Sequence, residues 1–451
     1  MATLDKNEVL GYAPDPPTPL GRCRALSPLA SVRVSPLQLG GMNIGDAWAK
    51  YGMGAMDKES SFKLLDAFYE AGGNFIDTAC NYQNETSEKF IGEWAEQRGI
   101  RNELVIATKY TSHYKRADDR IKIKANYVGN NAKSLFLSVE DSLKKLRTTY
   151  IDILYVHWWD WNTSIEEVMD HLHNLVVARK VLYLGISDTP AWVVASANQY
   201  AKLTHKTPFV IYQGAWNVMD RSFEREIIPM ARSLGMALAP FKVLAGGRLR
   251  SDAEEEKRLA SGEKGGHYFN QIGSATRTRR RCVHSVPTVS VYGFPDGREL
   301  RPPSCSLRGV PSPSPPLGGE LVFSAVLGGS AGADMRLVGM PGRQSLEKVA
   351  KEVGTEYITA VAIAYVMQKT PYVFPIIGGR KVEHLMANIE ALKIALSDEQ
   401  IKYLKSILPF DPGFPHSLIG DGTQSVPFFL ENAAREDKVL LRQPIKPKVS
   451  K

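Results

Sequence analysis

From residue 34 to 249, short apolar runs alternate with amphipathic stretches, and one more apolar run follows near residue 375. This alternation is the pattern of successive strand–helix units. The predicted strands are Ser35–Met42, Asn74–Thr78, Leu104–Lys109, Ile151–His157, Val181–Ser187, Phe209–Gln213, Ala237–Val243 and Phe374–Gly378. Eight strands that alternate with helices and short loops predict an α/β fold of the (β/α)8 TIM barrel type.

The stretches between the predicted strands have helical periodicity. After the first strand, Asp57 is a suitable N-cap, Phe62, Leu65 and Tyr69 recur at helical spacing, and Gly72 ends the pattern. The same reasoning predicts helices at about 86–98, 131–147, 164–178, 191–203, 222–234, 345–368 and 382–393.

One segment breaks the alternation. Residues 272–342 hold nine prolines, eleven glycines, nine serines and eight arginines but no lysine. Segments such as Pro311–Pro316 cannot form a helix or a central strand, so we expect an insertion after barrel unit seven. Two explanations stay open: a disordered, solvated loop, or translated non-coding or frame-shifted sequence. The predicted organisation is an N-terminal extension (1–33), a barrel (34–410) that contains the insertion, and a C-terminal tail (411–451).

Composition narrows the class of protein. Of 451 residues, 43% are hydrophobic and 23% are charged, which is ordinary for a globular protein with a large core. The formal charge of +8 has no clustered basic patch, so we expect no nucleic-acid partner. No apolar run reaches the roughly 18 residues of a membrane span. Four scattered cysteines and the absence of a signal pattern at the N-terminus favour the cytoplasm.

Four reactive residues lie at or just beyond the ends of predicted strands. Asp77 and Tyr82 lie five residues apart after the second strand, Lys109 ends the third, and His157 ends the fourth. In a barrel of parallel strands these ends open onto one rim, where catalysis takes place. Each residue alone has an ordinary structural explanation. Together, a carboxylate, a phenol, an amine and an imidazole predict a site that delivers a proton.

Metal and nucleophile chemistry have little support. His171 and His173 lie two apart on a predicted helix, so they face different sides and cannot share an ion. No Gly-x-Ser-x-Gly elbow is present. We therefore expect no metal site.

The order of the four reactive residues resembles that of the aldo-keto reductases, over most of residues 30–410. The stretches Leu39–Trp48 and Glu70–Ala79 are most similar to fungal aryl-alcohol dehydrogenase-like members, including norsolorinic-acid-reductase-like enzymes of secondary metabolism. The resemblance implies an NADPH-dependent oxidoreductase that interconverts a carbonyl and an alcohol on an aromatic, polyketide- or terpenoid-derived small molecule. We expect a monomer or a homodimer.

Physical chemistry gives each of the four residues a role. A carbonyl that accepts hydride develops negative charge on oxygen and needs a proton. Tyr82 is the predicted general acid, and we expect Lys109, held by Asp77, to lower its pKa from about 10 by favouring the phenolate. We expect His157 to donate a hydrogen bond to the carbonyl oxygen.

The cofactor's phosphates are expected at the loops after strands seven and eight. No Gly-x-Gly-x-x-Gly follows the first strand, whereas barrels often bind phosphate at these two loops. Arg380 and Lys381 would pair with an adenosine 2′-phosphate, which indicates NADPH/NADP; ordinary solvated cations at a helix start are the alternative. By resemblance, Gly378, Arg380, His384 and Asn388 cover the adenosine, and Leu244, Gly246 and Arg248 lie near the pyrophosphate.

At the nicotinamide end, Ser187, Asp188 and Gln213 align with the residues that hold the carboxamide in the family. Asp188 departs from the commoner asparagine, and a carboxylate cannot donate to the amide oxygen. Trp216 stands where an aromatic ring stacks on the nicotinamide; core packing is the alternative.

Tryptophans crowd the predicted rim. They are expected either to form a pocket for flat substrates or to seal the barrel top. The residues are Trp48, Trp158, Trp159 and Trp161. Two other hypotheses for the whole chain stay open: a non-catalytic, cofactor-sensing subunit like the barrel subunits of potassium channels, and a barrel inactivated by residues 272–342.

Overall fold

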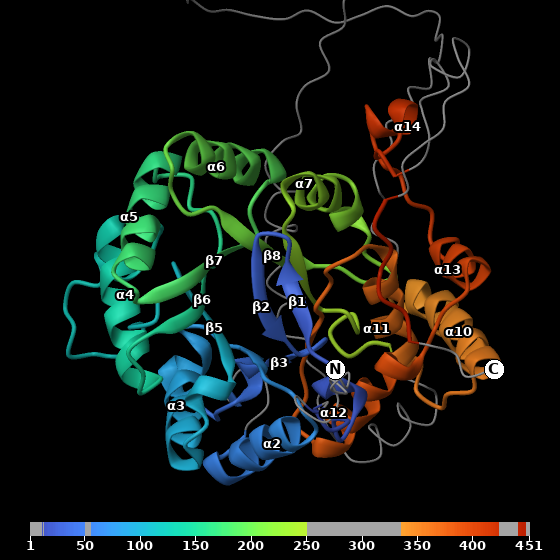
Figure 1. Cartoon of the computed structure of the whole chain (residues 1–451), viewed down its shortest axis with the longest axis horizontal. Helices are drawn as coiled ribbons and strands as arrows, with labels where there is room; N and C mark the ends of the chain where they lie inside the picture. The colour runs from blue at the N-terminus through green and yellow to red at the C-terminus, as the bar shows by residue number, and fades with distance from the viewer. Residues whose placement is uncertain (1–10, 12, 50–55, 250–334, 424–440, 448–451) are drawn as a thin grey trace, which may run out of the picture. The chain divides into compact units, whose positions relative to one another are not determined.

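The computed structural model describes residues 11, 13–49, 56–249, 335–423 and 441–447. Its core is a sheet of eight parallel strands in the order β10-β3-β4-β5-β6-β7-β8-β9. A parallel bridge between Leu238 and Val373 joins the two ends of the sheet. The predicted (β/α)8 barrel is therefore confirmed (Figure 1).

The barrel strands are shorter at the seam than the sequence indicates. β3 is reduced to Gln38–Gly40 and β10 to Ile376–Ile377, whereas the strands opposite the seam reach six or seven residues. The others are β4 (Phe75–Asp77), β5 (Val105–Tyr110), β6 (Ile151–Val156), β7 (Val181–Ser187), β8 (Phe209–Ala215) and β9 (Ala237–Phe241).

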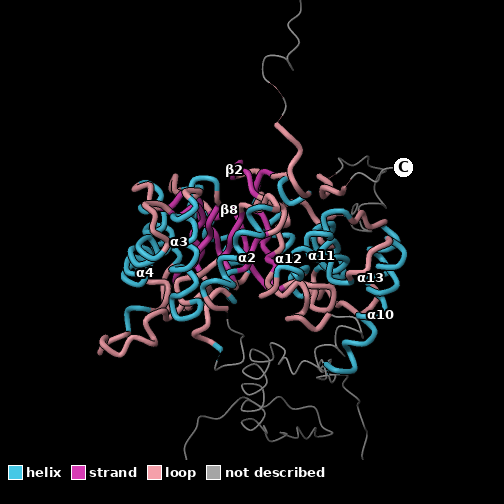
Figure 2. Tube along the Cα trace, turned by 90° about the horizontal axis from the view of Figure 1, so that it is seen from below, coloured by secondary structure: helices cyan, strands magenta, loops and turns pink. Residues whose placement is uncertain are grey.

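Helices surround the strands, as Figure 2 shows from a second direction. Side-chain caps set several starts: Asp57 accepts a hydrogen bond from the Ser60 amide, Asn131 from that of Ser134, and Ser164 from that of Glu167. The helices are α2 (Lys58–Glu70), α3 (Thr86–Arg98), α4 (Ala132–Lys145), α5 (Ile165–Val177), α6 (Ala191–Leu203), α7 (Ile227–Leu234), α10 (Met335–Val353), α11 (Ile358–Lys369), α12 (Val382–Ile389), α13 (Asp398–Lys405) and α14 (His416–Ile419).

The N-terminal extension contains a feature that the sequence did not predict. Strands β1 (Arg24–Ser27) and β2 (Ala30–Val34) form an antiparallel hairpin, which crosses the middle of the ring of strands in Figure 1. Leu26, Ala30 and Val34 pack in one cluster with Phe75 and Val105, the first residues of β4 and β5. The hairpin therefore closes the end of the barrel opposite the strand ends that carry the reactive residues.

The C-terminal third differs from prediction in two ways. The single helix expected at 345–368 is two helices, α10 and α11, because Gly354 adopts a positive φ of 74° that ends the first. Residues 335–342, expected within the insertion, belong to α10; residues 272–334 lie outside the described part of the chain. None of the described helices has the length and apolarity to cross a membrane.

Candidate active site

The centre of the site is a buried ion pair between two barrel strands. Asp77 ends β4, and Lys109 is the last but one residue of β5. The Lys109 ammonium donates to both Asp77 carboxylate oxygens at 2.8 and 2.7 Å, and to the Thr78 carbonyl at 2.7 Å. Both side chains are almost fully buried, so each charge depends on the other.

Two further residues of the barrel wall contact this ion pair. The Gln213 amide on β8 donates to Asp77 Oδ1 at 2.8 Å. The Tyr155 ring on β6 lies with its centroid 5.7 Å from Lys109 Nζ. Gly185 on the next strand leaves room for that ring, because a Cβ there would lie 2.5 Å from it. The sequence reasoning assigned Gln213 to a cofactor and did not identify Tyr155.

Tyr82 begins a strained turn, η4 (Tyr82–Glu85), just beyond β4. Its three followers, Gln83, Asn84 and Glu85, all have positive φ values, of 51°, 49° and 78°. Non-glycine residues rarely adopt this conformation, so the surrounding contacts must hold it. The turn places the Tyr82 ring with its centroid 5.0 Å from Lys109 Nζ and 5.9 Å from that of His157.

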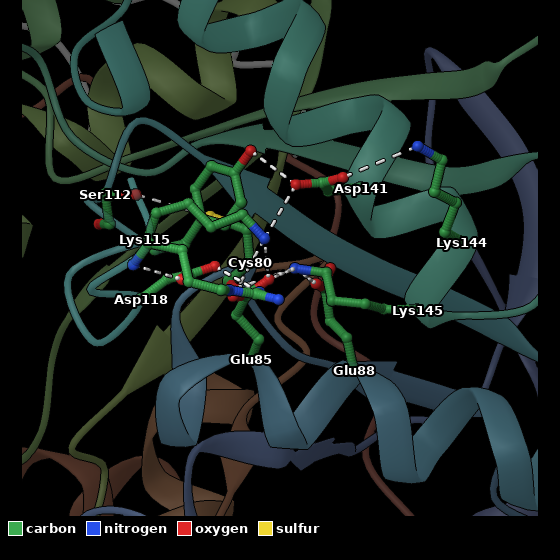
Figure 3. A network of polar contacts seen from close by, with 11 residues as sticks. Cys80, Glu85, Glu88, Ser112, Lys115, Asp118, Asp141, Lys144 and Lys145 are labelled. Carbon is green, nitrogen blue, oxygen red and sulfur yellow. Dashed lines mark hydrogen bonds and ion pairs between the residues drawn. The ribbon is translucent and has the colours of Figure 1, made fainter. Parts of the chain in front are cut away.

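A network of ion pairs around Glu85 and Glu88 holds this turn (Figure 3). Glu85 binds Lys115 at 2.9 Å and Lys145 at 3.2 Å. Lys145 also binds the fully buried Glu88 at 2.7 Å, and Glu88 accepts from the Thr108 hydroxyl at 2.6 Å. The turn that carries Tyr82 is thus anchored to α4 and to the loop after β5.

His157 follows β6 directly and faces the edge of the Tyr82 ring at an interplanar angle of 75°. Its Nδ1 lies 3.0 Å from the Ser112 hydroxyl, and its backbone amide donates to Thr111 Oγ1 at 3.3 Å. Burial and the nearby Lys109 charge lower the pKa of His157 to about 3. The imidazole is therefore neutral at physiological pH.

The electrostatics correct one sequence-based expectation. Burial, followed by the charge of Asp77, raises the pKa of Tyr82 well above its usual value instead of lowering it. Burial also lowers the pKa of Lys109, which Asp77 offsets only in part. Lys109 donates its hydrogen bonds to Asp77 and Thr78, and the negative charge of Asp77 opposes the stabilisation that Lys109 gives to the phenolate. Tyr82 consequently holds its proton at neutral pH.

Ser187 and Asp188 lie at the end of β7, next to Gln213 on β8. The Ser187 hydroxyl is buried and has no hydrogen-bond partner among the described residues, as expected of a group that awaits a polar ligand. Asp188 follows β7 at the rim, with φ of 41°. The residue as a whole is exposed, but the protein around its carboxyl group removes part of the hydration and raises the pKa of that group to about 6.

Trp216 takes the second of the two alternatives that the sequence left open, core packing. Its side chain is completely buried, and its ring stacks on Phe223 at 5.6 Å between centroids with an interplanar angle of 16°. Its indole N–H donates to Glu224 at 3.2 Å. Trp216 therefore packs in the core in this structure, with one ring face against Phe223.

The four rim tryptophans do not form one wall. Trp48 lies edge-on to Tyr82, 6.2 Å between centroids, and Trp158 donates to Ser112 at 3.1 Å. Trp159 is buried in the core. Trp161 is 65% exposed and lies 6.4 Å from the 61% exposed Trp192, which the sequence reasoning did not consider. Only Trp48 and Trp158 border the reactive groups.

The predicted phosphate loops present a different surface. After β9, Ala245, Gly246 and Gly247 have positive φ values in a turn beside Leu244 and the exposed Arg248. After β10, the Gly378 backbone, Arg380, Lys381 and His384 are exposed, while Asn388 is buried on α12.

The start of α12 fits an anion. None of the described side chains caps it, so the amides of its first turn can bind an anion beside the two cations. The chemistry of these loops therefore fits the phosphates of a dinucleotide, and the unpartnered Ser187 hydroxyl fits its polar amide end.

Within the residues that the structure describes, no group of three or more His, Cys, Asp or Glu side chains is placed to hold an ion. The reactive rim can instead present a protonated phenol and a neutral imidazole to one oxygen atom of a ligand.

Comparison with known proteins places this geometry in context. The chain matches the model of the aldo/keto reductase family over residues 36–409. It is 51% identical over 437 residues to the NADP(+) aryl-alcohol dehydrogenase of Phanerodontia chrysosporium, which covers 96% of this chain and 98% of that protein. Two proteins of Emericella nidulans are also similar. Aldo-keto reductase ausK is 46% identical over 92% of this chain and 88% of its own length, and norsolorinic acid reductase stcV is 45% identical over 91% of this chain and 88% of its own length.

Proposed function

Because this chain belongs to the aldo/keto reductase family, we propose that it is an NADPH-dependent oxidoreductase of fungal secondary metabolism that acts in the cytoplasm. Its substrate is an aromatic, polyketide- or terpenoid-derived small molecule that carries a carbonyl or alcohol group. The single observation that carries this proposal is the meeting of Tyr82, His157 and the Asp77–Lys109 pair at one rim. The names of the relatives support the substrate class.

The cofactor would be held by two sets of residues. Arg380, Lys381 and the start of α12 bind the adenosine phosphate, with Gly378, His384 and Asn388 beside it. The loop of Leu244, Gly246 and Arg248 follows the pyrophosphate. Ser187 and Asp188 hold the carboxamide. When bound, the reduced nicotinamide supplies a hydride to the carbonyl carbon.

The chain's own residues perform the acid–base chemistry. Tyr82 donates its phenolic proton to the carbonyl oxygen as negative charge develops there, and His157 donates a hydrogen bond to the same oxygen. Lys109 stabilises the resulting phenolate, which is costly in this buried place without a nearby cation. Asp77, fixed by Gln213, keeps Lys109 charged and oriented. In oxidation of the alcohol, Tyr82 acts as the base.

The test follows NADPH absorbance with the full-length chain and a panel of aromatic and aliphatic aldehydes and ketones, beside a titration of NADPH and NADH binding. We expect consumption of NADPH with aromatic carbonyl compounds and weaker binding of NADH. Tight NADPH binding without turnover of any carbonyl compound would indicate a cofactor-sensing subunit. Absence of nucleotide binding would indicate an inactivated barrel, and deletion of residues 272–334 should then restore binding.

A further inference from the structure

His157 can donate to a carbonyl oxygen only through the ring nitrogen that carries its proton. A neutral imidazole has one protonated nitrogen, either Nδ1 or Nε2, and a neighbour decides which. The low pKa of His157, about 3, means that this choice applies throughout the physiological range. In the structure, the neighbour that decides which nitrogen carries the proton is Ser112.

The hydrogen bonds around Ser112 determine the direction of each proton. The Trp158 indole N–H, which can only donate, points at Ser112 Oγ at 3.1 Å. The same oxygen lies 3.0 Å from His157 Nδ1. If Nδ1 carried the proton, two donors would meet at one oxygen, and the serine proton would have no acceptor among the residues that the structure describes. If the hydroxyl donates to Nδ1, each of the two contacts joins one donor to one acceptor, and the one remaining proton, on Nε2, is left for the oxygen atom of a ligand.

From this geometry we propose that Ser112 is a positioning residue: oriented by the Trp158 indole, its hydroxyl donates to Nδ1 and keeps the His157 proton on Nε2. The Nε2–H then points into the site beside Tyr82. The proposal deepens the proposed function and rests on it for the meaning of that donor, but the tautomer itself is a property of the protein alone.

The loops that carry Ser112 and Trp158 are fixed to each other. Thr111, just before Ser112, has φ of 88°, a strained value for a β-branched residue. The buried Asn130 holds both sides of the contact: its amide donates to Thr111 Oγ1 at 2.9 Å and to the Trp158 carbonyl at 3.0 Å. The chain therefore maintains a costly backbone conformation where the serine hydroxyl meets the imidazole.

A spectroscopic experiment reads the tautomer directly. The full-length chain, labelled with 15N in its nine histidines, is studied by two-bond 15N–1H correlation, and His157→Gln assigns the signals. We expect the Nε2–H pattern in the wild type and a mixture of tautomers in Ser112→Ala. Ser112→Thr, which keeps the hydroxyl, should restore the Nε2–H pattern. An Nδ1–H pattern in the wild type, or an unchanged pattern in Ser112→Ala, would overturn the proposal.

Kinetics separate positioning from a purely structural role. We expect Ser112→Ala to lower kcat by roughly three- to tenfold, the scale of one displaced hydrogen bond, with unchanged NADPH affinity. Trp158→Phe removes the indole donor but keeps a ring, and should lower kcat less. Ser61→Ala removes a fully buried hydroxyl on α2, far from the site, and should leave kcat unchanged. An equal loss of kcat in Ser61→Ala would assign the effect to stability and overturn the positioning role.

Failure of this proposal is distinguishable from failure of the proposed function. A chain that turns over no carbonyl compound refutes the function, whereas its histidine spectra still report the tautomer. An active chain with an Nδ1–H pattern at His157 refutes only the role of Ser112.

Discussion

The two sides of the barrel rim differ in how they treat charge. At the ends of β4–β6, Asp77 and Lys109 are buried and bind each other, Gln213 and the backbone. At the ends of β9 and β10, Arg248, Arg380 and Lys381 are exposed on glycine-containing loops. In the proposed function, the groups that act on the reacting atom are thus fixed before a ligand arrives, whereas the groups proposed to bind a charged ligand face solvent. We call these the reactive side and the binding side.

The sharpest test of the reactive side removes the phenolic proton. Tyr82→Phe should lower carbonyl reduction by about 10²–10⁴-fold, the usual contribution of a positioned general acid, because no other side chain in the described site carries a proton at that position. NADPH affinity, measured by fluorescence titration, should stay unchanged. Tyr69→Phe on α2 is the matched control. Retained turnover in Tyr82→Phe would remove the main distinction between the two sides.

The buried pair should matter for stability as well as for rate. Lys109→Met leaves the Asp77 carboxylate buried without its cation, which should destabilise the fold by about 3–5 kcal/mol in urea unfolding. The double variant Asp77→Leu with Lys109→Met removes both charges and should recover most of that loss without recovering activity. If the double variant regained activity, the pair would be structural only.

The binding side should show the opposite behaviour, namely loss of affinity without loss of stability. Arg380→Ala should weaken NADPH binding by about tenfold, because a charge-assisted hydrogen bond to the 2′-phosphate is lost, and should leave NADH binding unchanged. Lys202→Ala, an exposed cation on α6, serves as control. Equal weakening of NADPH and NADH would place the 2′-phosphate elsewhere.

The sequence predicts some features of the molecule better than others. Asp77, Lys109 and His157 could be found because each lies at the end of a strongly apolar strand, and strand order then brings them together. The hairpin β1–β2 was missed because Leu26, Ala30 and Val34 show their role only against the barrel interior.

Details that depend on side-chain direction could not be predicted. Trp216 occupies a position near a strand end that can face either a ligand or the core, and only packing against Phe223 decides it. The pKa of Tyr82 was expected to fall because a cation was near, but the degree of burial and the pairing of that cation with Asp77 are three-dimensional quantities. Ser112 gave one usable signal, a hydroxyl three residues beyond Lys109, just past the strand end.

Asp188 follows β7, between the reactive side and the binding side of the rim. The smallest effect that we expect is its influence on the pH dependence of cofactor affinity. Its pKa is raised to about 6, so its carboxyl group is neutral below that pH and negative above it. Oxidised nicotinamide carries a positive charge that the reduced ring lacks. The affinity for NADP(+) relative to NADPH should therefore increase as pH rises through 6, by at most about fivefold for an exposed pair. The 2′-phosphate also titrates near this pH, but it is common to both forms of the cofactor and cancels in the ratio of affinities.

The variant Asp188→Asn should make the ratio of affinities independent of pH. The control variant Asp119→Asn, which changes an exposed carboxylate on the loop after β5, should leave the pH dependence in place. A flat ratio in the wild type would place Asp188 away from the nicotinamide and leave the binding side to the β9 and β10 loops alone.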